Sequence, residues 1–203
     1  RDSPSAHICT LIQRRLALIF APFELDLEDN VNLNLACGTL SHLRPNDSLK
    51  IIKTWLNGWA TSHRMHEDVV LPCLLGCAIG KDSLSHYVMC PHMFAFCKYF
   101  FKSTDCPLVR LGIKNPTISN VKIIACVFSA YHALKGQVRS CTIDLRNDSR
   151  TKTRECWSVF AQTLGAEAGE RDIPFVLFSL PKFISSLSSG SVHSQMNSIH
   201  DDT

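Results

Sequence analysis

Hydrophobic and polar residues recur with a helical period along most of this chain. Apolar side chains stand three or four positions apart, a spacing that places them on one face of a helix. The pattern predicts helices over residues 8–20, 47–59, 91–101, 119–138 and 153–168. We therefore expect a mainly α, irregular helical domain.

The same spacing predicts which side chains of these helices are buried. The first helix places Ile8, Leu11, Ile12, Arg15 and Ile19 along one stripe, and Pro22 ends it. The second, capped by Asp47 or Ser48, turns Leu49, Ile52, Leu56 and Trp59 to one face and ends near Asn57-Gly58. The last two helices are expected to bury Ile123, Ile124, Val127, Tyr131, Leu134, Trp157, Phe160 and Leu164.

Other segments carry a weaker pattern. Residues 21–45 fit either short helices or a loop, and residues 175–180 fit either a strand or a buried turn of helix. The Ser-rich tail at 185–203 has few large apolar residues and is expected to be disordered. The predicted division is an N-terminal helical segment at 1–45, a helix with a Cys/His module at 46–105, a helical segment at 106–184, and the tail.

Composition narrows the class of protein. Of 203 residues, 45% are hydrophobic and 19% charged, which is typical of one globular domain, alone or with a small satellite. The formal net charge of +3 permits contact with nucleic acid without requiring it. No apolar run approaches the length that spans a bilayer, so we expect no membrane association. The chain opens with Arg1, which suggests a fragment of a longer protein.

The sharpest local pattern lies between Cys73 and Cys90, which reads Cys-x3-Cys-x8-His-x3-Cys. Three thiols and one imidazole at this spacing are typical of a structural zinc site, which takes four protein ligands in a tetrahedron. Gly76 allows a tight turn between Cys73 and Cys77. A helix capped by Asp82 or Ser83 would place His86 and Cys90 one turn apart. The predicted ligands are Cys73, Cys77, His86 and Cys90.

Other interpretations of the cysteines remain open. The chain has 10 Cys, so some fall at suggestive spacings by chance, and a buried free Cys behaves as a small hydrophobic residue. A secreted protein with a disulfide framework is a further alternative, which the irregular scatter of the cysteines and the hydrophobic fraction disfavour. We expect reduced thiols and residence in the nucleus or cytoplasm.

Three blocks of sequence resemble the region that follows the polymerase domain in non-LTR retrotransposon reverse transcriptases. They are KTWLNGWATSHRMH, the cluster with KDSLSHYVMCP, and VKIIACVFSAYHAL. The block DSLSHYVMCPHMFAFC also resembles the reverse-transcriptase zinc-binding domain of plant proteins. The likeness covers about residues 50–135.

The resemblance implies a nucleic-acid-binding accessory segment that engages template RNA or target DNA during target-primed reverse transcription. It also implies that Cys73, Cys77, His86 and Cys90 bind the metal. The partners would be RNA or single-stranded DNA and an upstream polymerase domain of the same polyprotein. No polymerase, endonuclease or hydrolase motif is present, so we expect no enzymatic activity from this segment alone.

A candidate nucleic-acid surface precedes the cluster. Lys50, Lys53 and Arg64 are expected to contact phosphates, and an exposed Trp55 could stack on an unpaired base. The alternatives are a solvated charged face and a buried tryptophan, since tryptophans at helical spacing usually belong to a core. A helical protein–protein interaction module, held together by the Cys/His cluster, is the alternative function.

Overall fold

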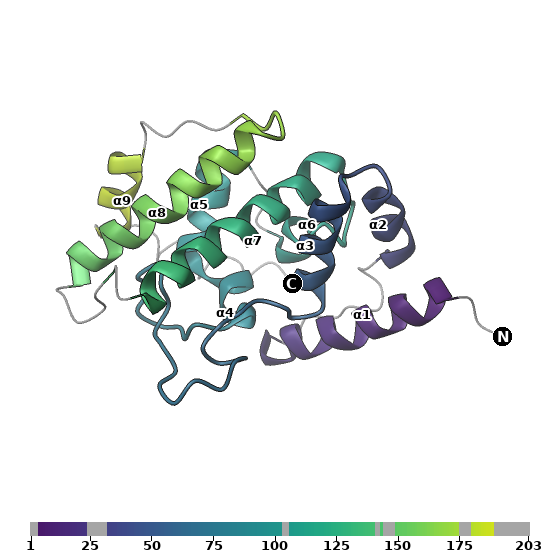
Figure 1. Ribbon diagram of the computed structural model, residues 1–203, viewed down its shortest axis with the longest axis horizontal. Helices are drawn as coiled ribbons and strands as arrows, with labels where there is room; N and C mark the ends of the chain where they lie inside the picture. Colours follow the sequence, from purple (N-terminus) through teal and green to yellow (C-terminus); the bar gives the residue numbers. More distant parts are fainter. Residues whose placement is uncertain are drawn as a thin grey trace, which may run out of the picture. The chain divides into compact units, whose positions relative to one another are not determined.

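The computed structural model describes residues 4–23, 32–102, 106–140, 143, 149–174 and 180–188. Nine α-helices and one short 3-10 helix lie in these ranges, with a single isolated β-bridge (Figure 1). The helices are α1 Pro4–Phe20, η1 Ala21–Phe23, α2 Leu33–Leu40, α3 Pro45–Trp55, α4 Leu84–Met89, α5 Pro91–Phe101, α6 Pro107–Arg110, α7 Ile118–Arg139, α8 Ser149–Gly169 and α9 Leu180–Ser188. The prediction of a mainly α fold is confirmed.

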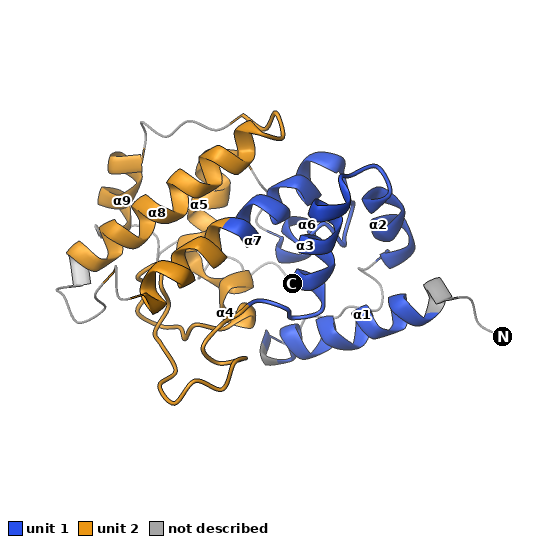
Figure 2. Ribbon diagram, viewed as in Figure 1, with its two compact units in different colours: residues 1–59, 104–129 blue, residues 60–103, 130–203 orange. Residues whose placement is uncertain are grey.

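The chain divides into two compact units, each built from two separate stretches of sequence (Figure 2). Unit 1 comprises residues 1–59 and 104–129, and unit 2 comprises residues 60–103 and 130–203. Helix α7 contributes its first part to unit 1 and its last part to unit 2. This grouping cuts across the segments read from the sequence, because the helix before the Cys/His cluster belongs to unit 1 and the cluster itself to unit 2.

Unit 1 has an apolar core formed by helices α1, α2, α3, α6 and the first part of α7. Trp55 is fully buried there, and its indole N–H donates to the carbonyl of Leu111 at 2.8 Å. Trp59 lies just beyond α3, buried, with its indole N–H 2.9 Å from the hydroxyl of Thr54. The expectation that the helix ends near Asn57-Gly58 with Trp59 folded back is confirmed.

Two predicted faces in unit 1 differ from the structure. In α1 the predicted Ile12 and Ile19 are buried, together with Leu16 and Phe20, but Ile8 and Leu11 are about half exposed. In α3 the buried residues are Asp47, Ile51, Thr54 and Trp55, and Leu49 is exposed. In both helices the apolar residues fit two adjacent faces. Tertiary contacts decide which of the two faces is buried, and sequence spacing alone does not determine those contacts.

Unit 2 has an aromatic core around Phe96 of α5. Its ring stacks on Trp157 of α8 with centroids 5.0 Å apart, and meets Phe160 and Phe183 edge to face at 5.5 Å. Phe160 and Leu164 are fully buried, as expected for the inward face of α8. Phe183 belongs to α9, so the first residues assigned to a disordered tail, 185–188, are helical. Residues 175–179 and 189–203 lie outside the described part of the chain.

Candidate metal centre

A short loop of unit 2 carries the first two cysteines of the cluster. Its two ends run antiparallel: the Asp82 N–H donates to the Leu71 carbonyl at 2.8 Å, and the Cys73 N–H to the Gly80 carbonyl at 2.9 Å. Between them the chain turns at Gly76, whose φ of +78° is a left-handed conformation that glycine adopts without strain. The sequence predicted a tight turn at Gly76, and this glycine does adopt the left-handed conformation between Cys73 and Cys77.

The other two residues of the cluster come from α4 and from the residue that follows it. The Ser83 hydroxyl caps α4 by accepting a hydrogen bond from the His86 N–H at 3.2 Å. Cys90 lies between α4 and α5, fully buried, immediately before Pro91. Of the two residues proposed as caps, Ser83 takes that position and Asp82 does not.

The ligand atoms of Cys73, His86 and Cys90 lie within 4.8 Å of one another, so this group could hold a metal ion. The sulfurs of Cys73 and Cys90 are 3.9 Å apart. Two thiolates that share a tetrahedral zinc at Zn–S distances of about 2.3 Å stand about 3.8 Å apart. The separation of the sulfurs therefore fits a shared metal ion of this size.

Cys77 is the fourth residue of the predicted set. It falls outside the group of three that meet within 4.8 Å, yet its buried thiol interacts with Cys90 and His86. The structure thus places the four predicted residues in one neighbourhood and brings three of them into metal-binding geometry.

The imidazole of His86 has one ring nitrogen whose hydrogen bonding is incomplete. Its Nε2 atom is buried and has no hydrogen-bond partner, which is costly for a polar group unless something binds it. The ring lies directly against Gly80, where a Cβ atom would collide with it. His86 is therefore held with an unsatisfied nitrogen, and its ring belongs to the same cluster as Cys73 and Cys90, which fits a metal ligand.

The charges in this cluster favour thiolates. The pKa of Cys77 is lowered to about 4 and that of Cys73 to about 5, in each case chiefly through a hydrogen bond from the Cys90 thiol, with His86 contributing. Burial opposes a charge on His86, but the two neighbouring thiolates outweigh it and raise its pKa to about 9. Burial raises the pKa of Cys90 well above its usual value. Thiolates are the form of cysteine that binds metals.

Two further residues hold the turn between Cys73 and Cys77. The carbonyl of Leu75 accepts the indole N–H of Trp157 at 3.1 Å and lies 2.8 Å from Nδ1 of His92. Trp157 is 82 residues away in the sequence, so no local pattern could have assigned it to this loop. The helical pattern at 153–168 predicted that Trp157 is buried, but it could not predict that its partner is the Leu75 carbonyl.

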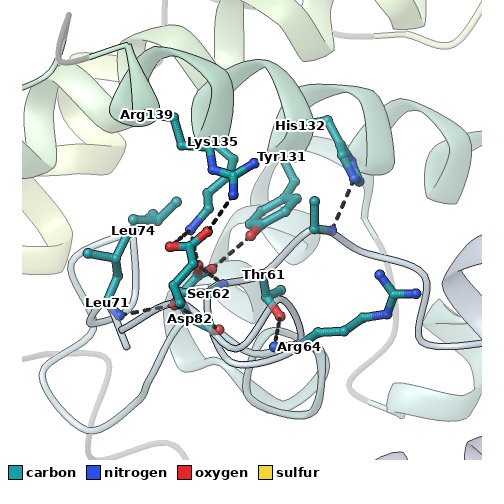
Figure 3. Close-up of polar contacts among 12 residues, drawn as sticks. Thr61, Ser62, Arg64, Leu71, Leu74, Asp82, Tyr131, His132, Lys135 and Arg139 are labelled. Atoms are coloured by element: carbon teal, nitrogen blue, oxygen red, sulfur yellow. Dashed lines mark hydrogen bonds and ion pairs between the residues drawn. The ribbon is translucent and has the colours of Figure 1, made fainter. Parts of the chain in front are cut away.

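A buried carboxylate next to the cluster was also missed. Asp82 is completely buried, and its Oδ2 accepts from the Lys135 ammonium of α7 at 2.8 Å and from the Ser62 N–H at 2.7 Å (Figure 3). Lys135 also donates to Glu67 at 3.2 Å, and Glu67 pairs with Arg139 at 3.0 Å. This network fastens the segment before the cluster to the last part of α7.

The predicted nucleic-acid residues are divided between the two units. The expectation of an exposed Trp55 is wrong, because its ring is fully buried in unit 1 and its N–H is bound to a carbonyl. Lys53 is exposed and Lys50 partly exposed on α3 of unit 1. Arg64 is exposed on unit 2, where its side chain extends away from the Asp82 network (Figure 3).

Comparison of the chain with models of protein families, with curated proteins and with solved structures found no match. The likeness to the reverse-transcriptase zinc-binding domain therefore rests on the sequence blocks alone. None of the helices in the described ranges combines the length and apolar character needed to cross a membrane.

Proposed function

We propose that unit 2 binds one structural Zn²⁺ through Cys73, Cys77, His86 and Cys90. The observation that carries this proposal is the meeting of the ligand atoms of Cys73, His86 and Cys90 within 4.8 Å, together with the buried Nε2 of His86 that makes no hydrogen bond. Sulfur and imidazole ligands in a tetrahedral set favour zinc over magnesium or calcium, which prefer oxygen. Four protein ligands leave no open position for water, so the role of the ion is structural.

When bound, the ion cross-links the loop of Cys73 and Cys77 to α4 and to the start of α5. The loop itself, all of which the structure describes, has no helix and only one isolated β-bridge, and a metal ion supplies the constraint that regular secondary structure would otherwise give. His92 and Trp157 hold the carbonyl of Leu75 and thereby orient the turn from outside.

We further propose that the chain is a nucleic-acid-binding accessory segment of a retroelement reverse transcriptase, without a polymerase or other active site of its own. The support is the resemblance of residues 50–135 together with the exposure of Lys53 and Arg64 and the partial exposure of Lys50. Its partners are RNA or single-stranded DNA and the upstream polymerase domain, in the nucleus or cytoplasm. Binding through phosphates predicts an affinity that falls steeply with salt.

Two measurements on the reduced chain test these proposals in order. Elemental analysis is expected to find one zinc per chain, and none after His86→Ala/Cys90→Ala substitution. RNA affinity is then measured over a range of salt concentrations for the parent and for Lys50→Ala, Lys53→Ala and Arg64→Ala. Each contributing residue should reduce the slope of log K against log salt by about 1. Lys182→Ala, an exposed lysine on α9, serves as the matched control.

The second candidate function is a helical protein–protein interaction module. It is favoured by the exposure of large apolar side chains on the segments beside the candidate metal site. Val69 and Ile79 are each 70% exposed, and Met65 and Val70 are 45% and 40% exposed. Such side chains gathered in one region are typical of a binding surface. An affinity for RNA with no salt dependence, in a chain that holds zinc, would favour this function over the first.

A further inference from the structure

The carboxylate of Asp82 gathers hydrogen bonds from several segments of unit 2. Besides Lys135 and Ser62 on Oδ2, its Oδ1 accepts the hydroxyl of Tyr131 at 2.8 Å and that of Tyr87 at 3.0 Å. Burial, followed by the nearby Asp82 charge, raises the pKa of both tyrosines well above the usual value, so both hydroxyls remain protonated donors. The carboxylate is thus a fixed point, completely buried and held by four donors.

Tyr87 and Tyr131 share this acceptor but differ in what else they join. Tyr131 belongs to α7 and links that helix to Asp82 (Figure 3). Tyr87 belongs to α4, and its hydroxyl also accepts the backbone N–H of Leu74 at 3.1 Å. Leu74 follows Cys73 directly and lies in the turn that leads to Cys77. Among the hydrogen bonds described, the one from the Leu74 N–H to Tyr87 is the only link between the Asp82 network and the backbone between Cys73 and Cys77.

A continuous line of hydrogen bonds therefore runs from Lys135 through Asp82 and Tyr87 to Leu74. Donation to a carboxylate makes the phenol oxygen a stronger acceptor, so each bond reinforces the next. The backbone of Asp82 also binds Leu71, just before the loop. The position of the loop is in this way set from α7, which contributes none of the four candidate ligands.

We propose that Tyr87 is a positioning residue for the metal centre: it holds the Leu74 amide, and thereby the sulfurs of Cys73 and Cys77, where the ion requires them. This inference rests on the proposed zinc site. Partners of this kind, which do not touch the ion, change metal affinity by about 10- to 100-fold when they are removed. The Asp82–Lys135 pair fixes the position of the Tyr87 hydroxyl. It therefore affects the metal centre only through Tyr87.

The pair of tyrosines supplies a matched experiment on the full chain. Tyr87→Phe and Tyr131→Phe each remove one hydroxyl from the same carboxylate oxygen at a buried site. Zinc affinity is measured by competition with a chromophoric chelator, and stability of the metal-free chains by urea unfolding. We expect both variants to lose stability, and Tyr87→Phe somewhat more, because the Leu74 N–H also loses its acceptor. Tyr87→Phe should weaken zinc binding about 10- to 100-fold, and Tyr131→Phe should weaken it less than about 3-fold.

Cobalt substitution gives a readout that global stability does not move. Co²⁺ bound by thiolates absorbs through charge transfer from sulfur, so a displaced Cys73 or Cys77 changes the spectrum. We expect an altered spectrum for Tyr87→Phe and the parent spectrum for Tyr131→Phe. Equal zinc affinities in the two variants, with unchanged cobalt spectra, would overturn the positioning role while leaving the metal site intact. A parent chain that binds no metal would instead overturn the proposed function.

If Tyr87→Phe fails to fold, the proposal can still be tested by measuring hydrogen exchange of the Leu74 amide in the unsubstituted chain. The Leu74 amide should exchange slowly, and it should stay protected after zinc is removed, because Tyr87 holds it independently of the ion. Fast exchange of this amide in the folded, metal-free chain would contradict the proposal.

Discussion

Two pairs of cysteine sulfurs, one in each unit, stand at nearly the same separation. Cys9 of α1 and Cys37 of α2 are 4.0 Å apart in unit 1, and Cys73 and Cys90 are 3.9 Å apart in unit 2. Their electrostatic states are opposite. Burial and the neighbouring Cys9 raise the pKa of Cys37 to about 11, whereas that of Cys73 is lowered to about 5.

The difference in pKa comes from the groups that surround each pair and not from the distance between its sulfurs. In unit 2 a histidine and two further thiols surround Cys73, so a negative charge is shared and paired. In unit 1 a thiolate at Cys37 would be desolvated next to another thiol. Proximity of two sulfurs therefore does not by itself indicate a metal site, whereas the cluster of unit 2 adds an imidazole, a second kind of metal ligand, to the sulfurs.

The largest expected effect is a loss of stability on removal of zinc, which should be confined to unit 2. If zinc is structural, its removal by a chelator should destabilise unit 2 by about 4 kcal/mol where free zinc had been a thousandfold above its Kd. Amide exchange should accelerate in α4 and α5, while α1 and α3 of unit 1 change little. Uniform acceleration across both units would show that the metal does not act on unit 2 in particular.

The fully buried ion pair of unit 2 should contribute more to stability than a pair of unit 1 in which only the carboxylate is buried. Lys135→Met leaves the buried Asp82 carboxylate without its cation, so we expect a loss of about 3–5 kcal/mol in urea unfolding. Asp82→Asn in the same chain should restore part of it. Arg44 pairs with Asp47 at 3.0 Å; Asp47 is buried, but the Arg44 side chain is 55% exposed, so water already screens the pair and Arg44→Ala should cost about 1–2 kcal/mol. Equal costs at the two sites would contradict this ordering.

One buried tryptophan in each unit allows the effect of the metal to be distinguished from a general loss of stability. Trp55 and Trp157 each donate an indole N–H to a backbone carbonyl, that of Leu111 in unit 1 and that of Leu75 in unit 2. Replacement of either by Phe should cost about 1–3 kcal/mol of stability, because a buried carbonyl loses its donor. Chelator competition should detect weaker zinc binding, by about 10-fold, only for Trp157→Phe. Weaker binding in Trp55→Phe as well would point to a general loss of structure.

The smallest effect concerns reactivity and not stability. In the metal-free chain at neutral pH, Cys77 with a pKa of about 4 is a thiolate and Cys37 with a pKa of about 11 is not. Brief iodoacetamide labelling, mapped by mass spectrometry, should therefore modify Cys77 before Cys37. Zinc should protect Cys77 and leave the slower labelling of Cys37 unchanged. Protection of both residues would mean that the metal acts outside the cluster.

The helices could be predicted from local periodicity, and their partners could not. The pattern at 153–168 marked Trp157, Phe160 and Leu164 as buried, and all three are. The face of α3 was wrong because Leu49 and Ile51 are both apolar, and only tertiary packing distinguishes them. Sequence spacing likewise selected the Cys/His residues, since their separations within the chain are short.

The hydrogen-bond network around the site was beyond prediction from one sequence. Asp82 was a reasonable candidate for a helix cap, because it precedes α4 and Ser83 stands beside it. Its partner Lys135 is 53 residues away and lies on a helix expected to be buried through its apolar residues. A lysine in an amphipathic pattern predicts a solvated position, so the buried pair contradicts the local rule.

The interleaving of the two units limits how the protein can be divided. Each unit is completed by a later stretch of chain, so a single cut between residues 60 and 129 separates parts of the same unit. A peptide that spans Cys73 to Cys90 would contain all four candidate ligands, together with Asp82 and Tyr87. It would lack Lys135, and so the carboxylate would return to water and the tyrosine would lose its anchor. The cluster is therefore compact in sequence, and a peptide of these residues alone should bind zinc less tightly than the full chain does.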